Sequence, residues 1–176
     1  MNPFALLAPL FLAAPALPQD TAVDPKCATM RVAIPPEFAG WSERIPVTAG
    51  GAPRTAPVLT VGRATDLTLL ATEEFTPVVQ PGKMADVHTS GGIAMFQVTH
   101  AGTYRVALGS GAWIEVIQAR KSLTSTAHGH GPMCTGIRKI VDFRLKPGRY
   151  VLQLSGSPTP VIPVLIVHAP AARHGA

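Results

Sequence analysis

The sequence has little that could hold it in a membrane. A membrane helix needs about 20 consecutive apolar residues, and after position 17 no segment reaches that length without a charge. The only long apolar run, Phe4–Leu17, is shorter and has the length of a signal-peptide core. Ala14 and Ala16 form an A-x-A-like cleavage site. We therefore expect residues 1–16 to be a signal peptide. The mature chain is then exported, periplasmic or secreted, and not membrane-spanning. A buried N-terminal helix is the alternative, since the first three residues carry no Lys or Arg.

Enzyme motifs are missing as well. There is no His-Glu-x-x-His zinc motif, and Gly129 and Gly131 do not continue into a dinucleotide- or phosphate-binding pattern. Ser110 lies between two glycines, in a segment typical of a hairpin turn rather than of a nucleophile elbow. Glu73 and Glu74 are adjacent and would face opposite sides of a strand. A non-catalytic role is favoured.

Helical periodicity is also lacking. Outside the first run, no apolar pattern with a spacing of three to four residues extends over ten residues. Short apolar runs divided by Gly and Pro take its place from Val58 onward. They are Val58–Val61, Thr65–Ala71, Phe75–Gln80, Gly92–Thr99, Thr103–Gly109, Ala112–Gln118, Ile137–Leu145, Arg149–Ser155 and Val161–His168.

Three of these runs alternate clearly between apolar and polar residues. We expect the apolar sets to be buried: Tyr104, Val106 and Leu108; Val141, Phe143 and Leu145; Tyr150, Leu152 and Leu154. A period of two residues is typical of strands with one face in the core. Residues 58–170 are therefore predicted to form an all-β domain, an antiparallel β-sandwich with a jelly-roll-like arrangement.

Residues 17–57 have no such pattern and contain seven prolines. Proline fixes φ and cannot donate to a strand ladder, so neither a long helix nor a central strand fits here. We expect an irregular, Pro-rich N-terminal arm. Phe38 and Trp41 are the residues through which it could dock on the domain.

Only two cysteines are present, Cys27 and Cys134. An even cysteine count in an exported chain indicates a disulfide, and two cysteines allow one intramolecular pairing. The bond would tie the arm to the segment around residue 130. The alternative is that Cys134 is a free thiolate that binds a metal ion.

That segment reads His128-Gly-His130-Gly-Pro-Met133-Cys134. Two imidazoles at positions i and i+2 of an extended chain point to one face. They could bind Cu²⁺ or Zn²⁺, with sulfur from Met133 as a further ligand. Alternatively, the glycines form a tight loop and the histidines bind backbone carbonyls. The second interpretation implies no cofactor.

The net charge of +5 is unevenly distributed. Between Gln118 and Tyr150 the sequence has seven basic residues and one Asp: Arg120, Lys121, Arg138, Lys139, Arg144, Lys146 and Arg149 against Asp142. An exported protein rarely meets nucleic acid, so an anionic envelope lipid or glycan is the expected partner of a basic face. A solvated strand face is the other interpretation.

Trp113 is one of only two tryptophans, with Trp41. Trp113 shares one strand face with Glu115 and Ile117, opposite Ile114 and Val116. It is therefore either a platform on the surface or a core residue that packs against the N-terminal arm. With Arg138 and Lys139 it is the candidate partner-binding surface.

Two segments, Ala101–Gly109 and Pro147–Ser155, share the pattern small-Gly-x-Tyr-x-apolar-x-Leu. Each follows an apolar strand, Ala94–Val98 and Ile140–Leu145. Residues 90–156 thereby resemble the bacterial pre-peptidase C-terminal type of β-sandwich. Members of that group are secreted accessory domains, which implies an accessory role.

Residues Ala127–Leu145 also resemble the core of a small family of exported bacterial proteins without an assigned role. Members of that family sometimes carry the name homogentisate 1,2-dioxygenase. That name would imply an iron held by two histidines and one carboxylate. His128 and His130 could supply the histidines, but no Asp or Glu is close to them in the sequence.

The sequence thus predicts a non-catalytic, exported envelope accessory or binding module whose partner is a protein, a glycan or an anionic envelope component. Two alternatives stay open. One is a periplasmic Cu- or Zn-binding protein that uses the His-Gly-His loop, and the other is a metal-dependent, dioxygenase-like enzyme.

Export and oxidation predict a specific mass for the mature protein. The intact mass should lack the first ~16 residues. It should also be about 2 Da below the mass of the dithiol form, because forming one disulfide removes two hydrogens. Alkylation of two thiols without prior reduction would contradict this prediction.

Overall fold

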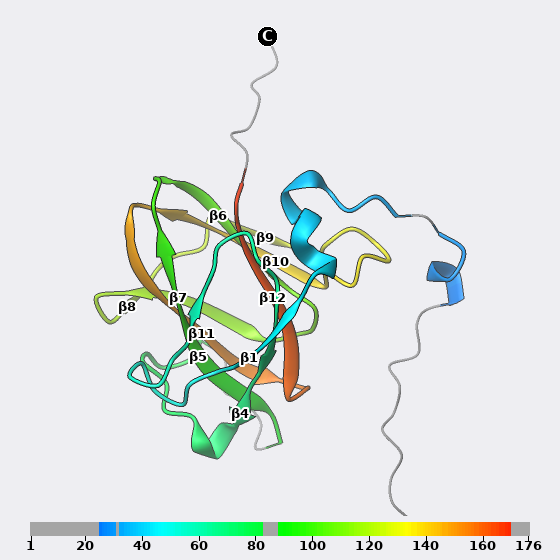
Figure 1. The fold of residues 1–176 in the computed structure, drawn as a ribbon. Coiled ribbons are helices and arrows are strands. Elements are labelled where there is room, and N and C mark those ends of the chain that lie inside the picture. The colour runs from blue at the N-terminus through cyan, green and yellow to red at the C-terminus, as the bar shows by residue number, and fades with distance from the viewer. Residues whose placement is uncertain (1–24, 31, 83–87, 170–176) are drawn as a thin grey trace, which may run out of the picture.

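The computed structural model describes residues 25–30, 32–82 and 88–169, so the predicted signal peptide lies outside the described residues. Two sheets pack face to face as a β-sandwich (Figure 1). The predicted all-β sandwich is therefore confirmed. Within the described ranges, no helix combines the length and the apolar character needed to cross a membrane.

The first sheet, sheet A, has the strand order β1-β3-β12-β6-β10-β9. Its strands are β1 (Ile45–Thr48), β3 (Thr65–Thr68), β12 (Val161–His168), β6 (Gly102–Leu108), β10 (Lys139–Leu145) and β9 (Ala127–Gly129). Sheet B has the order β2-β5-β11-β7-β8, with β4 paired to β5. Its strands are β2 (Val58–Leu59), β5 (Ser90–Val98), β11 (Gly148–Ser157), β7 (Trp113–Gln118), β8 (Lys121–Ser122) and β4 (Leu70–Ala71).

Most strand pairs are antiparallel, as predicted, but two short pairs are parallel. β1 pairs with β3, and β2 with β5, in the parallel sense. Parallel neighbours need a crossover connection. The chain provides one between β1 and β3 by visiting β2 in the other sheet.

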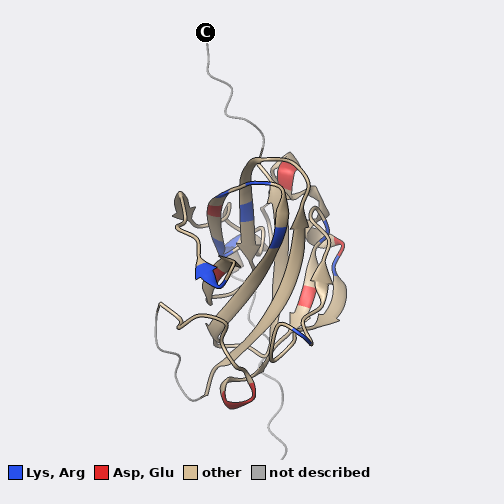
Figure 2. Cartoon of the chain, turned by 90° about the vertical axis from the view of Figure 1, so that its left-hand side faces the viewer, with Lys and Arg blue, Asp and Glu red and all other residues tan. Residues whose placement is uncertain are grey.

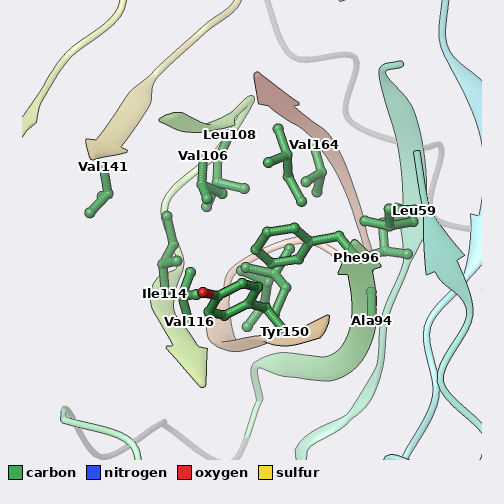
Figure 3. Close-up of a cluster of buried hydrophobic side chains, with 14 of the residues drawn as sticks. Leu59, Ala94, Phe96, Val106, Leu108, Ile114, Val116, Val141, Tyr150 and Val164 are labelled. Carbon is green, nitrogen blue, oxygen red and sulfur yellow. The ribbon is translucent and has the colours of Figure 1, made fainter. Parts of the chain in front are cut away.

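The core lies between the two sheets. All nine residues predicted from the alternation are buried, each with at most 6% of its surface exposed. Phe96 and Tyr150 stack at the centre with ring centroids 5.5 Å apart (Figure 3). Val106, Leu108 and Val164 of sheet A face these rings from the other side.

The repeated Gly-x-Tyr pattern has a structural basis. The Tyr104 hydroxyl donates to the His100 carbonyl (3.0 Å), and the Tyr150 hydroxyl donates to the Lys146 carbonyl (2.8 Å). Each tyrosine thus fixes the turn through which the chain passes from one sheet to the other. The two segments are equivalent strands, β6 and β11, of opposite sheets.

Residues 34–41 of the N-terminal arm cover part of the outer face of sheet A. It is irregular apart from β1 and two 3₁₀ helices, η1 (Pro25–Cys27) and η2 (Pro36–Ser42). Phe38 and Trp41 of η2 are buried, as expected, against Ala107, Leu165 and Val167. In Figure 1, η2 lies beside β12 and the loop after β9.

Two further links fasten the arm. Arg105 Nη1 pairs with Glu37 of η2 (2.9 Å), and Arg105 Nε pairs with Asp142 of β10 (3.3 Å). Cys27 and Cys134 form the predicted disulfide, with their Cα atoms 5.2 Å apart. Closing a loop of about 100 residues stabilises the fold by up to ~4.7 kcal/mol in the chain-entropy model.

One predicted strand is wrong. Residues 75–80 are not a strand but an irregular segment on the outer face of sheet B. Pro77 and Pro81 remove ladder donors from this stretch. The Val78 N–H donates instead to the side chain of Gln153 (2.7 Å). The short 3₁₀ helix η3 (Thr72–Glu74) precedes the segment.

Replacing Phe143 with Ala tests the packing of the core. Phe143 is 2% exposed between the sheets, so we expect the free energy of unfolding to fall by roughly 3–5 kcal/mol in urea denaturation. Arg144→Ala is the matched control, because the neighbouring side chain is exposed. Its change should stay within about 0.5 kcal/mol. Equal losses in both variants would contradict the assigned faces of β10.

Candidate functional site

The two histidines of the glycine-rich loop begin in a regular strand. His128 lies in β9, opposite Val141 of β10. His130 follows β9, and its Nδ1 is 3.0 Å from the Arg138 carbonyl, so Nδ1 is the donor. Both side chains are exposed. His130 therefore already has the kind of backbone partner that a structural loop needs.

The two sulfur atoms of this loop are an exposed thioether and half of a disulfide. Met133 is 71% exposed, and the sulfur of Cys134 is in the disulfide. No group of three or more His, Cys, Asp or Glu side chains in the described ranges could hold a metal ion. Glu37 and Asp142 line the same depression as the histidines, but both pair with Arg105.

The described residues consequently do not fit the iron site of two histidines and one carboxylate that the dioxygenase name implies. A copper or zinc site at His128, His130 and Met133 stays a prediction. It finds no third strong ligand in the part of the chain that the structure describes.

The predicted partner surface is only partly assembled. Lys139 Nζ lies 5.5 Å from the centroid of the Trp113 ring, and it donates to the Ala112 carbonyl (2.7 Å). Trp113 is 42% exposed, so the core interpretation of this residue is wrong. Arg138 is exposed and directly precedes Lys139. Neighbouring side chains along a strand point to opposite faces, so Arg138 does not share a face with Lys139.

Trp113 and Lys139 border a cavity of about 530 Å³. It opens along one side of the sandwich, between the β7–β8 edge of sheet B and the β9–β10 edge of sheet A. The lining residues are Gln80, Gly82, Trp113, Ile114, Glu115, Ser122, Leu123, Thr124, Ser125, His128, Lys139, Val141 and Phe143. A volume of this size is typical of small-molecule sites.

Sequence reasoning gave Glu115 no role, yet it is 4% exposed. The Gly82 N–H donates to Glu115 Oε1 (3.0 Å), and the side chain of Gln153 donates to Oε2 (3.1 Å). Gln153 in turn binds the backbone of Val78 and Val79. The pair therefore fastens the irregular segment over sheet B.

Burial perturbs two ionisable groups beside the cavity. It raises the pKa of Glu115, although hydrogen bonds from Gly82, Gln153 and Trp113 and the charge of Lys139 oppose the shift. Burial also lowers the pKa of Lys139, against the attraction of Glu115. Both shifts reflect the cost of keeping a charge away from water.

A second candidate site is the end of the sandwich at which β10 passes into β11. Gly148 pairs with Val98 and lies against the side chain of Gln118, so the turns 99–103, 118–122 and 144–149 meet there. Two of these turns carry five exposed cations, which we call the basic end: Arg120, Lys121, Arg144, Lys146 and Arg149. None of the five forms an ion pair with a described residue.

No Asp or Glu occurs in the described ranges 99–103, 118–122 and 144–149 that form the basic end. The acidic residues of η3 lie toward the opposite end, because β4 leads into η3 and pairs with the start of β5. In Figure 2 several blue segments lie near the top, together with a red segment, and a red loop lies at the bottom.

No family model matches the sequence, and no curated protein is significantly similar to it. One similar solved structure is the pre-peptidase C-terminal domain of a collagenase from Bacillus anthracis. It has 13% identity, covers 63% of this chain and 93% of that domain, and has a TM-score of 0.37. Another is a β-glucosidase from Paenibacillus barengoltzii, with 16% identity over 69% of this chain and 13% of that one, at a TM-score of 0.30. Both TM-scores lie below 0.5, and we infer function from this chain's own residues.

The His loop provides a test of the metal prediction. His130→Ala removes the hydrogen bond to Arg138, so the free energy of unfolding should fall by about 0.5–1.5 kcal/mol. The loss should be the same with zinc and with a chelator. His128→Ala, which removes no described hydrogen bond, is the control. A stabilisation by zinc that disappears in both variants would establish a metal site instead.

Proposed function

We propose that this chain is a non-catalytic, exported module that binds an anionic component of the cell envelope through its basic end. The observation that carries the proposal is the basic end itself. Five exposed cations gather there on two of its three turns, and no carboxylate lies in the ranges that form it. Such a cluster attracts phosphate and carboxylate groups at a distance of about a Debye length, ~8–10 Å.

The disulfide supports an exported location. Disulfides persist in oxidising compartments such as the periplasm and the extracellular space. Cys27–Cys134 joins the arm to the domain, so the bond is part of the folded protein. In those compartments anionic lipid headgroups and anionic glycans are the abundant partners for a basic surface, and nucleic acid is not.

The geometry of the basic end supports docking without insertion. The exposed large apolar residues of the described chain are Met30, Val58, Trp113, Met133 and Val161, and none belongs to the ranges of the basic end. Adhesion would therefore depend on charge and weaken with salt. The Tyr150 hydroxyl donates to the Lys146 carbonyl and so fixes the turn that carries Arg144, Lys146 and Arg149.

The polar groups of the cavity support a binding role rather than catalysis. Both oxygens of Glu115 already accept hydrogen bonds. Lys139 Nζ donates to one backbone carbonyl and keeps donors with which to hold an anion. A general acid or base instead needs its reactive atom within reach of a substrate proton.

Co-sedimentation tests the proposal. The disulfide-bonded protein should bind vesicles that contain phosphatidylglycerol at low ionic strength, and binding should weaken as salt is added. The double variant Lys146→Gln/Arg149→Gln should lose about 2 kcal/mol, roughly 30-fold in affinity, at about 1 kcal/mol per cation. Polygalacturonate in place of vesicles distinguishes a glycan from a lipid partner.

The matched control is Arg54→Gln/Arg138→Gln. It removes the same charge from exposed positions outside the basic end, and we expect close to wild-type binding. Equal weakening of both double variants would show that only net charge matters. Failure to bind both phosphatidylglycerol vesicles and polygalacturonate would reject the proposal.

A further inference from the structure

The cavity beside Trp113 is separate from the basic end. Lys139, at its rim, begins β10, whereas Arg144 and Lys146 lie at the other end of that strand. Its floor is apolar and comes from both sheets, with Ile114 on β7 facing Val141 and Phe143 on β10. A ligand on this floor would be inserted between the sheets at their open edge.

The floor favours an apolar ligand body. Ile114, Val141 and Phe143 belong to the core cluster, and Leu123 packs against that cluster. Transfer of apolar surface from water to such a floor is favourable in proportion to the area that is buried. Ser122, Thr124 and Ser125 also line the cavity, so polar atoms of a ligand can be accommodated at its rim.

The rim favours an anionic group on the ligand. The Lys139 ammonium has three donors but one described hydrogen bond, to the Ala112 carbonyl. No described carboxylate lies within ion-pair distance of it, and Glu115 is engaged by Gly82 and Gln153. A half-buried cation with donors to spare would bind a carboxylate more strongly than an exposed lysine would.

Trp113 argues against a stacked sugar. The Lys139 ammonium lies over its ring. Gly82 lies against the same indole, since a Cβ atom on Gly82 would be 2.7 Å from Cζ2 of Trp113. The ring is thus already in contact with two groups. Sugar binding by stacking needs an open aromatic face.

We propose that the cavity binds an amphiphilic carboxylate, with its apolar body on the floor between β7 and β10 and its carboxylate at the Lys139 ammonium. The occupant is a small molecule of the fatty-acid type. This proposal does not depend on the function of the basic end, because different residues carry it.

Titration of the disulfide-bonded protein with decanoate tests this proposal, with calorimetry and tryptophan fluorescence as readouts. Trp41 is 3% exposed and Trp113 is 42% exposed, so a ligand in the cavity should change mainly the emission of Trp113. Decan-1-ol, which has the same chain without the charge, should bind about tenfold or more weakly. Glucuronate, a carboxylate without an apolar chain, should not bind measurably.

Lys139→Met keeps the apolar stem and removes the charge. It should weaken decanoate about tenfold or more and leave decan-1-ol unchanged. Arg138→Met, at the exposed neighbouring position, is the control and should not change either affinity. Equal binding of decanoate and decan-1-ol by the wild type, or an unchanged affinity for decanoate in Lys139→Met, would overturn the role of Lys139.

Ser125→Phe places a ring in the cavity mouth and should abolish decanoate binding. Val58→Phe adds the same ring at an exposed position on β2, at the far edge of sheet B, and should have no effect. Circular dichroism and thermal unfolding confirm that each variant is folded. If Ser125→Phe binds decanoate as well as the wild type, the ligand lies elsewhere. If a neutral oligosaccharide shifts Trp113 emission at a lower concentration than decanoate, the cavity is a glycan site and the proposal is wrong.

Discussion

The apolar inner faces of the two sheets have to cover each other. The cavity and the positions of the charged residues on β10 depend on the point at which one sheet no longer covers the other. At the centre, Phe96 and Tyr150 are enclosed by long strands with partners on both sides. At one side edge the last strands are short: β8 has two residues and β9 has three. The sheets cannot close over each other there. Residues that would otherwise touch only core atoms, such as Val141 and Phe143, border a cavity instead.

The end of this covered region also determines where charged residues lie along β10. Inward positions from Val141 to Leu145 are apolar and at most 6% exposed. Lys139, also inward, lies where the cover ends, so its stem runs along apolar surface while its ammonium reaches the Ala112 carbonyl. Arg144, the nearest residue of the basic end, is five residues further along the strand, which at about 3.3 Å per residue is about 17 Å from Lys139. A single basic stretch in the sequence is therefore two separate features in the fold.

Features that depend on local spacing could be predicted from the sequence. Alternation placed Tyr104, Phe143 and Leu152 in the core, and the cysteine count gave the pairing of Cys27 with Cys134. Features that depend on a remote partner could not. Residues 75–80 look like a strand, but the N–H groups of Val78 and Val79 bond to Gln153, over 70 positions later. Glu115 occupies an outward position and would be solvated if that segment did not cover it. The cavity, too, exists only because edge strands from both sheets meet there.

The disulfide has a consequence for how the protein matures. Its cysteines are 107 positions apart, and the chain has no third cysteine. In a chain that crosses a membrane from its N-terminus, Cys27 emerges first and has no wrong intramolecular partner to capture. Oxidation can follow folding, once η2 has docked on sheet A and brought the arm to the loop after β9. Such a protein requires a thiol oxidant but not a disulfide isomerase, because there is no scrambled isomer to repair.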